Sequence, residues 1–253
     1  MDTPPLQGRV ALVTGAGRNI GRAIALALAD AGAKIAVNVR ASRGEAQAVV
    51  SEIAAYGGEA MMAAADVTER AQVDAMIVAI SERFGRLDIV VNNAAIRREA
   101  AFADLSFAEW RAAQAVCVDG AFHCTQAALT LLRNSGAGAV INIGGMTAYT
   151  GASHRAHVVT AKAALGGLTR ALAHELAPFG ITVNCVSPGL VDTVRKSASA
   201  SAAPAHRAHS HTLLGRRGNP AEIASAVVWF AGPGARYATG QTLHVNGGAY
   251  LGG

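Results

Sequence analysis

The chain has 253 residues, of which 51% are hydrophobic and 15% are charged, so it can bury a large core and is not intrinsically disordered. No stretch of about 18 residues runs without a polar break, which excludes a membrane span. Its 22 basic and 17 acidic residues give a net charge of +5, which raises nucleic acid, membrane surfaces and anionic substrates as partners to be weighed.

Short apolar runs alternate with amphipathic stretches along the chain. The runs typical of buried strands are Val10–Val13, Ile35–Val39, Met61–Ala65, Ile89–Val91, Ala139–Ile143, Thr182–Val186 and Thr242–Val245. Helical patterns fall between them, at residues 20–31, 44–56, 70–84, 107–133, 156–177 and 220–231. Five of these are followed by a glycine suited to a left-handed C-cap, namely Gly32, Gly57, Gly85, Gly136 and Gly180. The alternation predicts an α/β fold, a single doubly wound (Rossmann-type) parallel sheet with helices on both faces, with residues 1–253 as one domain.

Residues 195–217 interrupt this alternation with a small, polar sequence poor in core residues. The segment predicts a long mobile connection, and we expect a substrate lid over about 194–217. It holds five Lys and Arg residues and no Asp or Glu; without these five, 17 basic residues balance the 17 acidic ones. The excess charge therefore favours an anionic small-molecule substrate, or the phosphates of a cofactor, over nucleic acid or membrane, and basic residues do not interleave with aromatic ones.

The number and spacing of the Cys and His residues, together with the N-terminal sequence, bear on the cellular compartment and on metal binding. Three cysteines are no disulfide framework, and residues 1–5 lack the basic and apolar regions of a signal peptide. We therefore expect a cytoplasmic protein. His206, His209 and His211 lie in an Ala/Ser-rich stretch without a Cys or carboxylate partner, so we expect no metal site.

A glycine-rich loop follows the first predicted strand, with the sequence Thr14-Gly15-Ala16-Gly17-Arg18-Asn19-Ile20-Gly21. Gly15 permits a tight turn, Gly17 and Gly21 allow close approach of backbones, and the amides at the start of the following helix suit a pyrophosphate. Because the loop stands in the first strand–helix–strand unit, it favours dinucleotide binding over a plain turn.

With these motifs, the chain resembles the short-chain dehydrogenase/reductase family over nearly its whole length. Thr14–Gly21 is similar to the family's TGxxxGxG motif, with Asn19 at the middle glycine, where Asn tolerates left-handed backbone. Similar motifs recur at Asp66-Val67, Asn92-Asn93-Ala94-Ala95, Pro188-Gly189 with Thr193, and Gly240–Gly248. The resemblance implies a homotetramer or homodimer paired through the helices at 107–133 and 156–177. It places the cofactor contacts at Gly15, Gly17, Arg18, Asn19, Ile20, Gly21, Arg40, Asp66, Val67, Asn93, Ala94, Lys162, Pro188, Gly189 and Thr193.

The end of the second predicted strand bears on which dinucleotide is bound. It reads Val37-Asn38-Val39-Arg40, without the Asp or Glu that binds a ribose 2′-hydroxyl and repels a 2′-phosphate. Arg40 and Arg18 offer two guanidiniums to such a phosphate. The sequence therefore predicts NADP(H); NAD(H) stays open, as does the alternative that both arginines are ordinary surface residues.

The resemblance implies catalysis by a Tyr, a Lys four residues later, a Ser and an Asn. Lys162 falls on the lysine, but Val158 stands at the tyrosine position, Gly145 at the serine and Cys117 at the asparagine. The chain is thus an atypical member. All three replacements are smaller or less polar, which predicts a larger and more apolar pocket beside the nicotinamide.

Two side chains are candidates for the missing acid, beside Lys162. His154 shares a helical face with Val158, four residues on, if the helix already runs there. Tyr149 follows the Gly144-Gly145 turn and could overhang the substrate. For both, a surface or interface role is the alternative. His157 lies about 100° round the helix from Val158 and is expected to point away.

These features predict an oxidoreductase scaffold of short-chain dehydrogenase/reductase type that binds NADP(H) and acts on a small carbonyl or alcohol through a non-standard acid. Two alternatives stay open: a cofactor-binding pseudoenzyme without redox turnover, and a lyase, hydrolase or isomerase in the enlarged pocket.

Overall fold

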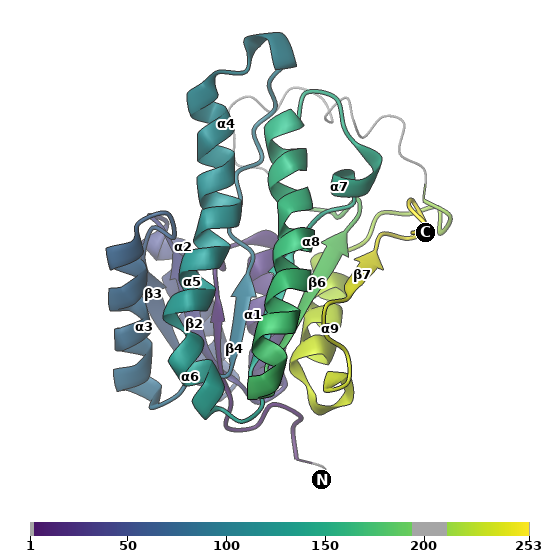
Figure 1. The fold of residues 1–253 in the computed structure, drawn as a ribbon. Helices are drawn as coiled ribbons and strands as arrows, with labels where there is room; N and C mark the ends of the chain where they lie inside the picture. The colour runs from purple at the N-terminus through teal and green to yellow at the C-terminus, as the bar shows by residue number, and fades with distance from the viewer. Residues whose placement is uncertain (1–2, 194–211, 253) are drawn as a thin grey trace.

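The computed structural model describes residues 3–193 and 212–252. Its centre is a seven-stranded, all-parallel sheet in the order β3-β2-β1-β4-β5-β6-β7 (Figure 1). The strands are β1 (Val10–Val13), β2 (Lys34–Val39), β3 (Ala60–Ala64), β4 (Ile89–Asn92), β5 (Ala139–Ile143), β6 (Thr182–Pro188) and β7 (Thr242–Val245). Their order reverses between β1 and β4, which creates the switch point where sheets of this kind bind ligands.

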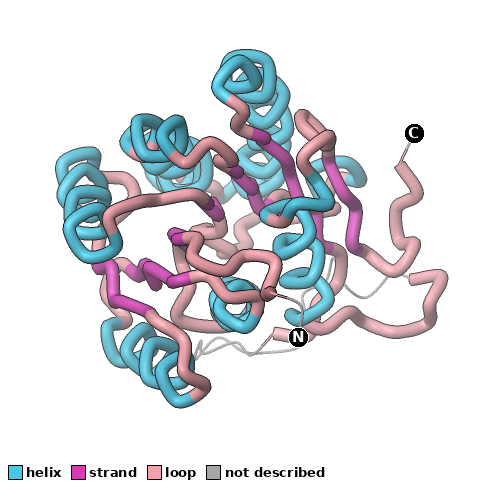
Figure 2. Tube along the Cα trace, turned by 90° about the horizontal axis from the view of Figure 1, so that it is seen from below, coloured by secondary structure: helices cyan, strands magenta, loops and turns pink. Residues whose placement is uncertain are grey.

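Helices cover both faces of the sheet and bury two apolar cores against it (Figure 2). One face carries α1 (Asn19–Asp30), α2 (Arg43–Ala55) and α9 (Pro220–Ala231). The other carries α3 (Arg70–Phe84), α5 (Gly120–Ala127), α6 (Leu129–Asn134) and α8 (Ala156–Leu176). Val13 faces the first core and Leu12 the second. Central strands are therefore apolar at most positions, because both of their faces are buried.

The predicted doubly wound fold is confirmed, and the predicted strands lie within two residues of the observed ones. All five glycines expected to end helices have positive φ. The prediction of one helix over 107–133 is wrong. That stretch divides into α4 (Phe107–Gln114), a π-helical turn (Ala115–Asp119), α5 and α6. The break lies where Gly120 packs closely against Val67, which follows β3, since a Cβ on Gly120 would lie 2.7 Å from Val67 Cγ2.

Short elements complete the described chain. They are α7 (Thr147–Thr150) and 3-10 turns at Phe102–Asp104, Ala177–Phe179 and Pro233–Ala235. No helix within residues 3–193 and 212–252 is long and apolar enough to cross a membrane. Most of the predicted lid over about 194–217 lies outside the described residues, at 194–211, and so do His206, His209 and His211.

Candidate active site

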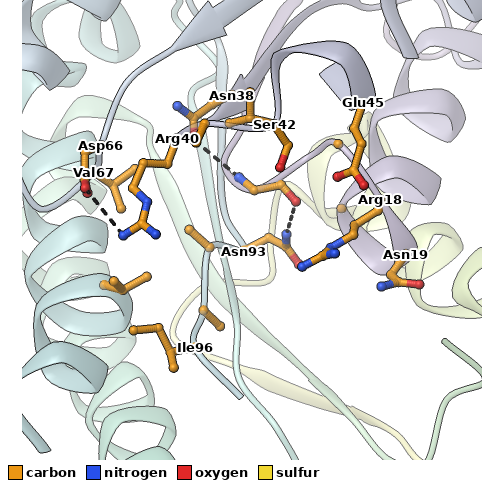
Figure 3. Close-up of a pocket in the computed structure, with 18 of the residues that line it drawn as sticks. Arg18, Asn19, Asn38, Arg40, Ser42, Glu45, Asp66, Val67, Asn93 and Ile96 are labelled. Atoms are coloured by element: carbon orange, nitrogen blue, oxygen red, sulfur yellow. Dashed lines mark hydrogen bonds and ion pairs between the residues drawn. The ribbon is translucent and has the colours of Figure 1, made fainter. Parts of the chain in front are cut away.

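A cleft of about 410 Å³ lies at the carboxyl ends of β1 to β4, over the switch point of the sheet (Figure 3). Eleven of the residues predicted to contact a dinucleotide line it: Gly15, Gly17, Arg18, Asn19, Ile20, Gly21, Arg40, Asp66, Val67, Asn93 and Ala94. The other four do not line it. Pro188, Gly189 and Thr193 lie at or after the end of β6, two strands along the sheet from β4, and Lys162 lies on α8.

The glycine-rich loop has the close backbone contacts that its sequence predicts. Gly15 has φ +61°, and Asn19 adopts φ +51°, so Asn19 takes the left-handed conformation expected of it in place of a glycine. A Cβ on Gly21 would lie only 2.3 Å from the Gly15 carbonyl oxygen. The first turn of α1 therefore packs directly under the loop. The amide groups at the start of a helix suit a negatively charged ligand.

Buried side-chain amides fix the loop to its neighbours. The Asn93 Nδ2 donates to the carbonyls of Thr14 (2.8 Å) and Gly15 (3.1 Å), and the Thr14 hydroxyl accepts from the Asn93 amide. Asn38 Oδ1 accepts from the Gly15 amide, and Asn38 Nδ2 donates to the carbonyls of Ala63 and Ala65. The roles of Thr14 and Asn38 were missed by the sequence prediction, although a polar residue inside an apolar strand is a usable signal.

One end of the cleft gathers charged and polar side chains. Arg18 and Arg40 both line it, and Arg40 forms a loose, solvent-exposed ion pair with Asp66 at 3.8 Å. Ser42, the N-cap of α2, and Glu45, in its first turn, also line the cleft, and Figure 3 shows Glu45 on the side of Arg18 and Asp66 on the side of Arg40. Neither Ser42 nor Glu45 was predicted. Two guanidiniums beside the start of a helix suit a phosphate group, so the residues present fit a phosphorylated dinucleotide.

Lys162 is buried at the carboxyl end of β5, where its Nζ donates a hydrogen bond to the Ile143 carbonyl at 2.5 Å. Burial lowers the pKa of this ammonium below its ordinary value of 10.5. The positive charges of Arg97 and Arg155 act in the same direction, whereas Cys117 and Cys185 oppose it. A lysine with a lowered pKa holds its proton less tightly and is a better acid than an exposed one.

The three replaced catalytic positions surround this lysine with little polar surface. Val158 is buried one turn before it on α8, and Cys117 is buried in the π-helical turn. A Cβ on Gly145 would meet only the Lys162 Cγ, at 3.9 Å, so there is room for a side chain where the sequence has none. None of the three replaced positions therefore offers a side-chain hydroxyl or amide group beside the ammonium.

The two predicted replacement acids do not share this space. Helix α8 begins at Ala156, and His154 precedes it with φ +60° and an exposed side chain. The expected helical face shared by His154 and Val158 is therefore absent. The Tyr149 hydroxyl faces Thr242 of β7 at 3.4 Å, and its ring packs on His244 and Tyr250. Tyr149 thus lies against the sheet edge and not over Lys162.

His157 is buried, since its side chain is only 1% exposed. Its Nε2 lies 3.1 Å from the Arg98 carbonyl, and the Ala100 amide donates to the His154 carbonyl at 3.0 Å. The N-terminal part of α8 is thereby bound to the segment that follows β4. Within the described residues, no group of three or more His, Cys, Asp or Glu side chains forms a metal site.

Known proteins resemble this chain both in sequence and in architecture. The model of the family described as enoyl-(acyl carrier protein) reductase matches residues 15–250. A 3-oxoacyl-[acyl-carrier-protein] reductase of Staphylococcus aureus is 39% identical over 241 residues, covering 95% of this chain and 98% of that protein. A protein of the same name from Synechocystis is 40% identical over 247 residues, covering 97% and 98%.

Solved structures agree. A dehydrogenase/reductase of Sinorhizobium meliloti superposes with a TM-score of 0.92 at 36% identity, covering 98% of each chain. A short-chain dehydrogenase of Burkholderia cenocepacia in complex with NADP superposes with a TM-score of 0.89 at 37% identity, covering 97% of this chain and 99% of that one. Fold and site together define an oxidoreductase scaffold with a dinucleotide cleft. The chain belongs to the short-chain dehydrogenase/reductase family.

Proposed function

We propose that this protein is an NADP(H)-dependent oxidoreductase that interconverts a small carbonyl compound and its alcohol. The observation that carries the proposal is the placement of two features on the carboxyl edge of one sheet: a phosphate-binding loop in the cleft at the switch point, and a buried lysine at the end of β5. The names of the relatives, which are oxidoreductases acting on carbonyl groups, support it.

The preference for NADP(H) rests on the charged end of the cleft. Arg18 and Arg40 flank the position that follows β2, and neither Val39 nor Arg40 there can repel a 2′-phosphate. Because Arg40 is 71% exposed and only loosely paired with Asp66, it can turn toward a phosphate at little cost. The relative from Burkholderia cenocepacia binds NADP, which supports the same choice.

Lys162 is the residue that we assign to proton transfer. The bound cofactor supplies or accepts the hydride. In the direction of reduction, Lys162 Nζ gives a proton to the substrate oxygen and regains one from solvent, so that the carbonyl becomes an alcohol. Its lowered pKa suits this role. The Ile143 carbonyl orients the ammonium through the 2.5 Å hydrogen bond.

The site is atypical in this proposal, because Val158, Gly145 and Cys117 stand where the family has its Tyr, Ser and Asn. Valine and glycine cannot donate a proton, so Lys162 acts without the usual partners. The apolar space they leave favours a substrate whose bulk beside the carbonyl is hydrophobic.

Assembly and location extend the proposal. Pairing through α4 to α6 and α8 gives the homodimer or homotetramer that the resemblance implies, with a cytoplasmic location. Size-exclusion chromatography with light scattering tests the assembly, and a monomer at micromolar concentration contradicts it.

The proposed function is tested by binding and by turnover. Titration of NADPH fluorescence measures affinity, and loss of absorbance at 340 nm with a panel of ketones measures reduction. We expect submillimolar NADPH binding and slow turnover that Lys162→Met lowers to a small residual rate at saturating NADPH. His154→Ala is the matched control and leaves the rate unchanged. NADPH binding without turnover of any carbonyl refutes the enzymatic proposal and favours the pseudoenzyme.

A further inference from the structure

A chain of four buried polar side chains lies on the face of the sheet that α5 and α8 cover. Asn92 of β4 and Asn142 of β5 are register partners on neighbouring strands, and Asn92 Nδ2 donates to Asn142 Oδ1 at 2.9 Å. Asn92 Nδ2 also donates to the Thr125 hydroxyl of α5 at 3.1 Å. At the other end, Asn142 Nδ2 donates to the Thr169 hydroxyl of α8 at 2.9 Å. All four residues are at most 5% exposed, so the chain joins α5 to α8 through the two strands between them.

Two members of this chain flank the hydrogen bond that Lys162 makes. Asn142 directly precedes Ile143, whose carbonyl accepts from Lys162 Nζ at 2.5 Å. Thr169 lies seven residues after Lys162 on α8, about two turns further along the same face of the helix. Helix α8 is therefore attached to β5 by two side-chain hydrogen bonds, one donated by Lys162 and one accepted by Thr169.

The hydroxyl of Thr169 both donates and accepts a hydrogen bond. It donates to the Leu165 carbonyl, one turn earlier on α8, at 2.7 Å, and it accepts from Asn142 Nδ2. Asn142 is held in turn, because its Oδ1 accepts from Asn92. Hydrogen bonds are directional, whereas the apolar contacts around them are not and tolerate small shifts of a helix. The chain therefore fixes where α8 lies along β5, and with it the position of Lys162 Nζ.

We propose that Asn142 and Thr169 are positioning residues that hold Lys162 Nζ in place for proton transfer. This inference rests on the proposed function and adds two buried residues that act through α8. Without the Thr169 hydroxyl, α8 keeps its apolar contacts but loses one of the two hydrogen bonds that attach it to β5. A displacement of about 1 Å at the reacting atoms is enough to slow a reaction up to about 100-fold.

Thr169→Val tests the proposal, because valine has nearly the shape of threonine and lacks its hydroxyl. Steady-state reduction of a ketone is measured at saturating NADPH, and NADPH affinity is measured by fluorescence titration. We expect kcat to fall about 10-fold, while KM for the ketone and the NADPH dissociation constant stay within about 2-fold of the parent. Thr169→Ser keeps the hydroxyl, so it is expected to restore the parental kcat.

Thr125→Val is the matched control, because it makes the same substitution at the opposite end of the chain, on α5. It removes the hydroxyl that accepts from Asn92 and leaves the hydrogen bond between Asn142 and Thr169 in place. Each valine variant loses one buried hydrogen bond, so we expect similar falls in the midpoint of urea unfolding. A parental kcat in Thr169→Val overturns the proposal. An equally low kcat in Thr125→Val does so as well, because lost stability would then explain both variants.

The position of Lys162 can also be followed without turnover. Reductive methylation with formaldehyde and cyanoborohydride, read by mass spectrometry of peptides, measures how fast Lys162 Nζ reacts. Lys34, whose side chain is 36% exposed, is the internal reference. Because Lys162 is only 8% exposed and hydrogen-bonded, we expect slow labelling in the parent and in Thr125→Val, and labelling about 5-fold faster in Thr169→Val.

Equal ratios of Lys162 to Lys34 labelling in the two valine variants refute the positioning role, whether or not the protein reduces a carbonyl compound. The proposed function stands or falls separately, on loss of absorbance at 340 nm by the parent protein.

Discussion

The close packing under the glycine-rich loop makes Gly21→Ala a sharp test of the cofactor site. The added methyl carbon would lie 2.3 Å from the Gly15 carbonyl oxygen, 2.6 Å from Asn93 Nδ2 and 3.0 Å from Ala16 Cα. Two of these three atoms are backbone atoms of the loop, so the loop must shift. Overpacking of this kind costs about 1–3 kcal/mol. The Asn93 hydrogen bonds to Thr14 and Gly15 weaken as well, at about 1 kcal/mol.

Gly44→Ala is the matched control, because it lies in the first turn of α2 and an added Cβ there meets nothing within 4 Å. It isolates the helix-propensity gain of alanine over glycine, up to about 1 kcal/mol. Urea unfolding and NADPH titration are measured for both variants. We expect Gly21→Ala to lower the free energy of unfolding by about 1–3 kcal/mol and to weaken NADPH binding about 10-fold or more, while Gly44→Ala lowers neither. Parental stability and affinity in Gly21→Ala would refute this packing.

Three further predictions concern charge and catalysis. Glu45→Gln removes a carboxylate from the arginine end of the cleft, so NADPH affinity rises by more than NADH affinity in parallel titrations; an equal change for both contradicts the placement of the 2′-phosphate. Asp88 is buried, which raises its pKa, but hydrogen bonds from Arg86, Ser135 and the Val10 amide outweigh burial and hold the pKa below its ordinary 3.8. Its stabilising contribution is therefore present above about pH 4 and is lost as the pH falls through the lower folded value. Asp88→Asn flattens this part of the stability–pH curve measured by urea unfolding, and an unchanged acid limb contradicts it. Finally, Val158→Tyr with Gly145→Ser supplies a proton donor beside Lys162, and the rate of ketone reduction at 340 nm rises about 10²- to 10⁴-fold; no increase in a folded double variant argues that these two positions do not face the substrate.

Much of the fold follows from local sequence. The strands are apolar at nearly every position because helices cover both faces, and this pattern located each of the seven within two residues. The glycine-rich loop and its left-handed Asn19 follow from backbone sterics, which act within a few residues. The cofactor cleft was predictable for the same reason, because its walls come from loops at consecutive strand ends.

The surroundings of Lys162 were less predictable because they depend on where helices begin and break. The helical pattern placed the start of α8 at residue 156, as observed, but the candidate His154 required a helix that begins earlier. The left-handed backbone of His154 precedes the helix and moves that side chain away. The π-helical turn that positions Cys117 contains neither Gly nor Pro, and the single glycine after it, Gly120, is tolerated within many helices. His157 contacts the carbonyl of Arg98, which lies on a loop far away in the sequence. The spacing of residues along a helix cannot predict a contact of this kind.

The central claim, that Lys162 handles the proton, is tested most directly by the pH dependence of single-turnover NADPH oxidation. With saturating ketone, the rate of the parent protein is predicted to fall on the alkaline side with an apparent pKa below 10.5, since burial lowers the pKa of Lys162. The residual rate of Lys162→Met should show no such limb, while NADPH binding persists. A Lys162→Met variant that retains both the parental rate and the alkaline limb would contradict the account.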